Sequence, residues 1–72
     1  MKDVIVLKRR DSASSTTYDR VTIAAAKNKT CYIITVSGPG EGFNISCLDE
    51  EETAGEMETL ASALVCGGYE RE

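Results

Sequence analysis

The sequence predicts an α+β domain with a small antiparallel four-stranded sheet and one C-terminal amphipathic helix packed on one face, in the order β-β-β-β-α. Four short segments rich in β-branched and aromatic residues are separated by turn-forming residues. The one stretch with clear helical periodicity follows them, at residues 48–68. With 72 residues, the chain 1–72 makes a single α+β domain with a small core.

The first two strands are expected at residues 3–8 and 18–27. The first contains the run VIVL, which is typical of a strand with apolar side chains on both faces. The second carries Val21, Ile23 and Ala25 at alternate positions. Its three consecutive alanines favour a helix, but the β-branched Val-Thr-Ile core decides for a strand. The polar segment 11–17 between them is expected to be a loop.

The third and fourth strands are expected at residues 30–37 and 43–48. In the third, Tyr32, Ile34 and Val36 point to one face, while the other face is also largely apolar. The fourth alternates Phe43, Ile45 and Cys47 with polar residues, the pattern of a half-buried antiparallel strand. The Gly- and Pro-rich segment between these strands is expected to be a turn, and the polar tail 69–72 is expected to fray.

The helix has recognisable signals at both ends. Asp49 is expected to be the N-cap, with Glu52 three residues later at the spacing of a capping box. Gly67 and Gly68 supply the residue with positive φ that commonly ends a helix. The apolar stripe that faces the sheet is expected to consist of Ala54, Met57, Leu60, Ala61, Leu64 and Val65.

One helix covers one face of a sheet, whereas two of the predicted strands are apolar on both faces. Apolar residues of these strands must therefore face away from the helix, and an uncovered patch of this kind usually marks an interface. We expect the open face or an edge strand to pair with another protein or with a second copy, giving a homodimer. The alternative is that loop 9–17 or the tail folds over the open face.

Charge is distributed unevenly along the chain. Residues 1–40 hold seven Lys or Arg against three Asp, whereas residues 41–72 hold nine Asp or Glu against one Arg. The acidic half suggests a docking surface for a basic partner, as an alternative to a solvated and dipole-favoured helix face. The residues predicted to make this partner-binding surface are Glu51, Glu52, Glu56 and Glu58.

The basic half of the chain suggests a second possibility. Lys and Arg side chains on a sheet can contact phosphates, and tyrosines can stack on bases. The net charge of −4 speaks against this, because dedicated nucleic-acid-binding domains are normally basic. The residues of this alternative nucleic-acid surface are Lys8, Arg9, Arg10 and Arg20.

Several function classes lack the residues they need. The chain has no His, its three Cys form no C-x-x-C pair, and no Gly-rich loop is followed by the Lys-Ser/Thr of a phosphate site. We therefore expect no enzyme activity, no cofactor and no metal, and, without a visible signal peptide or membrane span, a cytoplasmic protein. The expected function is a small acidic protein-binding module, an inhibitor or regulator of the phage or mobile-element type.

Overall fold

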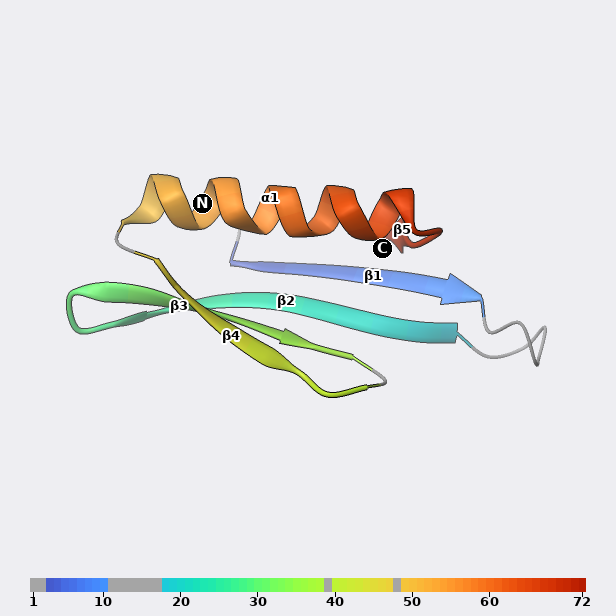
Figure 1. The fold of residues 1–72 in the computed structure, drawn as a ribbon, viewed down its shortest axis with the longest axis horizontal. Helices are drawn as coiled ribbons and strands as arrows, with labels where there is room; N and C mark the ends of the chain where they lie inside the picture. Colours follow the sequence, from blue (N-terminus) through green and yellow to red (C-terminus); the bar gives the residue numbers. More distant parts are fainter. Residues whose placement is uncertain (1–2, 11–17, 39, 48) are drawn as a thin grey trace.

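The computed structural model describes residues 3–10, 18–38, 40–47 and 49–72, with only the backbone for Arg10 and Tyr18. Over these residues the chain forms an antiparallel sheet of five strands and one helix (Figure 1). The α+β class agrees with the sequence prediction, whereas the count of four strands is wrong by one. The elements are β1 Val4–Arg10, β2 Tyr18–Asn28, β3 Cys31–Ser37, β4 Phe43–Cys47, α1 Glu50–Cys66 and β5 Glu70–Arg71.

The strands lie in the order β4-β3-β2-β1-β5, and every neighbouring pair is antiparallel. Helix α1 lies on one face of the sheet and runs alongside β1 (Figure 1). Seventeen helical residues extend about 26 Å, and the seven residues of β1 extend about 23 Å. Because the two lengths match, one helix is enough to cover the middle of this face.

The fifth strand arises from the way the helix ends. Gly68 takes φ 101°, and the amide of Tyr69 donates to the carbonyl of Leu64 at 3.0 Å. Together with the bond from the Gly68 amide to the Val65 carbonyl, this is a Schellman motif, which reverses the chain after the helix. The reversed chain pairs with β1, where Glu70 lies opposite Lys8. The prediction of a fraying tail is therefore wrong.

The start of the helix follows its prediction. Asp49 is the N-cap, and its carboxylate accepts a 2.7 Å hydrogen bond from the amide of Glu52. The buried line of the helix differs from the predicted stripe, since it is centred on Thr53, Met57 and Ala61, while Val65 is 45% exposed. Thr53 tolerates full burial because its hydroxyl donates to the carbonyl of Asp49 at 2.7 Å. Leu48, which is predicted to end the fourth strand and to begin the helical stretch, lies outside the described residues.

The core lies between α1 and the helix-facing side of the sheet. Alternation along each strand sends one set of side chains toward the helix and the other set to the open face. The buried apolar residues come from four strands and the helix. They are Ile5, Leu7, Val21, Ile23, Ile34, Cys47, Met57 and Ala61.

Candidate functional site

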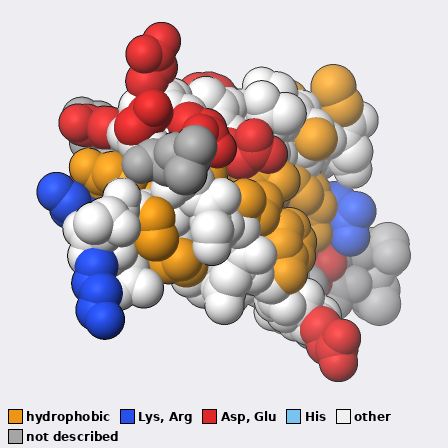
Figure 2. Space-filling view, turned by 60° about the vertical axis from the view of Figure 1, so that its left-hand side comes forward, with side chains coloured by type: hydrophobic (Ala, Val, Ile, Leu, Met, Phe, Trp, Pro, Cys, Tyr) orange, Lys and Arg blue, Asp and Glu red, His pale blue; other side chains and the backbone are white. Residues whose placement is uncertain are grey.

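The four glutamates predicted to bind a partner lie on α1, in two pairs on opposite flanks of the helix. Glu51 and Glu58 are two turns apart on one flank, and Glu52 and Glu56 are one turn apart on the other. The helix carries acidic residues in its first turn and no basic residue in its last. Figure 2 shows acidic side chains gathered over the helix, above a broken band of hydrophobic ones. The structure thus brings the four residues onto one element, as two rows rather than one cluster.

Glu58 differs from the other three because it has a partner within the chain. Its carboxylate accepts hydrogen bonds from the guanidinium of Arg71 at 2.7 and 3.3 Å. This interaction raises the pKa of Arg71, chiefly through the hydrogen bond to Glu58. Arg71 belongs to β5, so the flank of Glu51 and Glu58 faces the β5 side of the sheet. The flank of Glu52 and Glu56 therefore faces the side of β3 and β4.

The basic residues of the alternative nucleic-acid surface do not form one surface. Lys8 and Arg20 lie opposite each other on β1 and β2, on the open face. Arg9 points to the helix-facing side, where its guanidinium lies 4.7 Å from the ring centre of Tyr69 and 3.4 Å from the Asp19 carboxylate. The side chain of Arg10 lies outside the described residues.

Arg20 is engaged by the C-terminal residue. Its guanidinium donates two hydrogen bonds to the carboxylate of Glu72, at 3.0 and 3.2 Å. These bonds lower the pKa of Glu72, and attraction to Arg20 and Lys8 adds to the effect. The same pairing raises the pKa of Arg20. A cation already held by a carboxylate is a weaker phosphate contact, because binding must first break the existing pair.

The open face of the sheet is less apolar than the sequence predicts. Of its larger apolar side chains, Val4 is 46% exposed, while Val6 and Ile33 are half-buried. Small and polar side chains separate them in the cross-strand rows. These intervening residues are Thr22, Ala24, Ala26, Thr35, Asn44 and Ser46. The alternative that loop 9–17 covers the open face concerns residues that lie mostly outside the described part of the chain.

The two edges of the sheet have different chemistry. The β5 edge is two residues long, and both residues, Glu70 and Arg71, are charged. Short, charged edge strands are a common way for proteins to prevent further pairing. The β4 edge is five residues long, with the sequence FNISC, and it contains no charged residue and no proline. The β4 edge therefore lacks the protective features that the β5 edge has.

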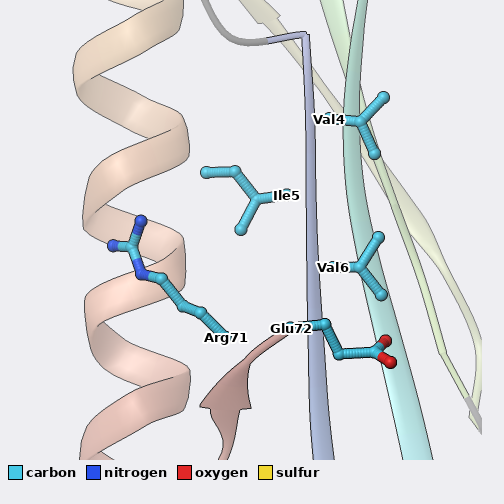
Figure 3. A pocket seen from close by; sticks show the side chains of 5 residues that line it. All are labelled: Val4, Ile5, Val6, Arg71 and Glu72. Carbon is cyan, nitrogen blue, oxygen red and sulfur yellow. The ribbon is translucent and has the colours of Figure 1, made fainter.

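A shallow pocket of about 370 Å³ lies where β5 leaves the start of β1 uncovered. Figure 3 shows Ile5 pointing toward the helix, with Val4 and Val6 on the other side of β1. Arg71 and Glu72 complete the lining, and both are already in ion pairs. A small-molecule site normally combines apolar walls with convergent polar groups. The polar groups of this pocket are committed elsewhere, so it is not a convincing ligand site.

Comparison of the chain with protein-family models, with curated proteins and with solved structures finds no match.

Within the described residues, no three His, Cys, Asp or Glu side chains are grouped so that they could hold a metal ion. None of the described helical structure is both long and apolar enough to cross a membrane. The acidic helix and the β4 edge of the sheet are the two surfaces with features suited to binding.

Sequence reasoning missed the pairings of the C-terminal residues. Arg71 and Glu72 belong to the segment predicted to be a fraying tail, yet they pair with Glu58 and Arg20. The alternation of charge in Glu-Arg-Glu at positions 70–72 was an available signal, because it places Arg71 on one face of a strand and its neighbours on the other. The sequence alone also does not distinguish whether the open face of the sheet or an edge strand pairs with another protein or a second copy.

Proposed function

We propose that the protein is a small protein-binding module whose acidic helix docks on a basic surface of another protein, acting as an inhibitor or regulator. The single observation that carries this proposal is the charge of α1 and its N-cap, which contain six acidic residues and no basic one. The effect of docking is steric occlusion of the partner's surface. Complementary charge speeds and orients such an encounter.

One acidic residue of the helix supports a role beyond solubility, because helix capping, the helix dipole and the ion pairs of the described residues do not account for it. Capping and the helix dipole account for acidic residues in the first turn, which contains Glu50, Glu51 and Glu52. Neither explains Glu56 or Glu58, since the dipole effect fades after that turn. Glu58 has a structural role through Arg71, which leaves Glu56 as the acidic residue least explained by the fold.

The nucleic-acid alternative receives no comparable support. Lys8 and Arg20 lie on one face and Arg9 on the other, and both arginines are within ion-pair distance of a carboxylate. A nucleic-acid surface needs cations gathered along one groove or face, so that several phosphates are neutralised together. We therefore retain docking on a protein as the proposed function.

The test is affinity capture from the native host with two proteins of equal charge change. The helix variant carries Glu51→Gln, Glu52→Gln and Glu56→Gln. The control variant carries Asp3→Asn, Glu41→Gln and Glu70→Gln, at exposed acidic residues outside the helix. We expect a partner captured by the wild type to be lost with the helix variant and kept with the control. Glu58 is changed only in a separate variant, because its loss also frees Arg71.

Three results would contradict the proposal. A partner that stays bound to the helix variant excludes the helix as the docking surface. Equal loss with the control variant shows that only net charge matters. Direct binding to random nucleic acid, with affinity falling steeply as salt rises, would favour the basic surface instead.

A further inference from the structure

The free edge of β4 is the part of the sheet that most needs cover. An edge strand presents a row of backbone N–H and C=O groups that can pair with another strand. In β4 this row runs for five residues, about 17 Å. Natural edges of this length usually carry a lysine, a proline or a bulge that discourages pairing. None of the five residues of β4 is charged or is proline, so the strand is open to pairing.

The side chains of β4 also show where cover is missing. Phe43, Ile45 and Cys47 share the helix-facing side of the sheet, and their exposure decreases along the strand. Phe43 is 50% exposed, Ile45 is half-buried, and Cys47 is 2% exposed. The helix thus covers the end of β4 that leads into it and leaves the beginning of the strand uncovered. Phe43 is one of three large hydrophobic residues exposed to this degree among the described residues.

We propose that two copies of the chain pair through their β4 edges, antiparallel, around a two-fold axis at Asn44. In this register Phe43 of one copy lies opposite Ile45 of the other, and Asn44 lies opposite itself. The two residues of β4 that still expose apolar surface therefore cover each other. Cys47 is already buried and needs no cover. The two five-stranded sheets become one continuous sheet of ten strands.

A second copy suits this edge better than a charged partner does. Directly opposed residues of an antiparallel pair lie on the same face of the sheet, so a two-fold axis brings the apolar side of β4 next to its own copy. On the open face, the two Asn44 side chains come close enough for their amides to hydrogen-bond each other. A strand without charge offers no attraction to the basic surface expected of the docking partner.

The interface between the two β4 strands is small, so we expect the dimer to be weak. Three residue pairs between the two β4 strands and two aromatic side chains bury less than the roughly 1,200 Å² typical of the smallest stable interfaces. We therefore expect a dissociation constant in the micromolar range or weaker. The pairing uses a different surface from the acidic helix, so it stands or falls independently of the proposed function.

Sedimentation equilibrium over a range of concentrations tests the pairing with two matched variants. Asn44→Lys places two like charges opposite each other on the axis, so we expect at least a tenfold weaker dimer. Thr35→Lys is the control, because Thr35 is exposed on the same face and is the β3 residue opposite Asn44. It adds the same charge one strand away from the edge, and we expect its dimer to match the wild type. A wild type that stays monomeric up to millimolar concentration, or equal weakening by both variants, overturns the proposal.

Disulfide cross-linking tests the register in a background with Cys31 and Cys66 replaced by Ser. With the axis at Asn44, the two residues 44 lie about 4.5 to 5.5 Å apart between Cα atoms, which is within disulfide range. We expect Asn44→Cys to cross-link rapidly on mild oxidation and Ile45→Cys to cross-link poorly. Efficient cross-linking at residue 45 alone would move the axis, and a dimer without cross-linking at either position would place the interface elsewhere.

The dependence of binding on salt concentration distinguishes β4 pairing from docking through the acidic helix. Pairing of uncharged strands should keep its dissociation constant when ionic strength rises from about 0.1 to 0.5 M, whereas docking of acidic on basic residues should weaken. A dimer that dissociates as salt rises would be held by charge and not by β4. Loss of partner binding in Asn44→Lys would show that the partner, rather than a second copy, occupies the edge.

Discussion

Arg20 and Glu72 stand 52 positions apart in the sequence, and their side chains are joined by two hydrogen bonds of 3.0 and 3.2 Å. Arg20 is in β2, and Glu72 follows β5, so the pair reaches across β1 on the open face. The amide of Glu72 also donates to the carbonyl of Val6 at 2.9 Å. The end of the chain is thus fixed by both its backbone and its side chain.

This ion pair predicts a specific dependence of stability on pH. Because the pKa of Glu72 is lower in the folded protein than its ordinary value of 4.5, the folded state favours the ionised carboxylate. The resulting stabilisation is present above the ordinary pKa and is lost as the pH falls through the lowered one. We expect Glu72→Gln to destabilise the protein near pH 7 and to have progressively less effect as the pH falls from about 5 to about 2.

Urea unfolding at several pH values measures this effect, with Glu41→Gln as the control on an exposed glutamate outside the ion pairs. The difference between wild type and Glu72→Gln should be modest, because the side chains of Arg20 and Glu72 are 64% and 30% exposed and surface pairs are screened by solvent and salt. A difference that is constant with pH, or one that grows in acid, would contradict the prediction.

Gly42 predicts a steric effect at the start of β4. A Cβ atom at this position would lie 2.6 Å from the carbonyl oxygen of Val36, which is too close for any real contact. Since that oxygen belongs to the backbone of β3, the strand must move to relieve the clash. We expect Gly42→Ala to cost about 1 to 3 kcal/mol of stability. Gly40→Ala is the matched control in the same loop, because a Cβ there meets no atom within 4 Å.

Chemical unfolding of the two variants gives the comparison directly. The control should unfold with a free energy close to that of the wild type. Equal stability of the two variants would mean that the start of β4 is free to shift away from β3. Such freedom would also weaken the register proposed for the dimer, because Phe43 follows Gly42 immediately.

The sequence predicted most of the fold because its signals were local. The capping bond from Glu52 to Asp49 and the alternation of Tyr32, Ile34 and Val36 depend on residues a few positions apart. The fifth strand was missed because residues 70–71 have little strand propensity and pair only through their position beside β1. A two-residue strand of this kind is decided by the tertiary structure and not by its own sequence.

The candidate site was less predictable, for a related reason. The sequence identified the acidic residues of the helix but could not show that Glu58 is held by Arg71, since that contact depends on β5. It also grouped Arg9 with Lys8 and Arg20, although strand alternation sends Arg9 to the opposite face. The strand order, which leaves β4 at an edge, follows from pairing across the whole sheet.

Gly55 predicts a gain in stability from a single substitution. A Cβ atom at this glycine meets nothing within 4 Å, and the residue is exposed within α1. Glycine in an exposed helix interior costs roughly 1 kcal/mol relative to alanine, because it loses more backbone entropy on folding. We expect Gly55→Ala to raise the free energy of unfolding by about 0.5 to 1 kcal/mol and the melting temperature by several degrees.

The reverse exchange, from alanine to glycine at another exposed position of the same helix, is the control. Ala63 is also exposed, so Ala63→Gly should lower the free energy of unfolding by a similar amount. Thermal unfolding followed by circular dichroism measures both changes. Because Gly55 lies between the two acidic flanks, partner capture with Gly55→Ala gives a second result. If the added methyl stabilises the fold but abolishes capture, the partner must approach the exposed top of the helix closely, which explains why a glycine stands there.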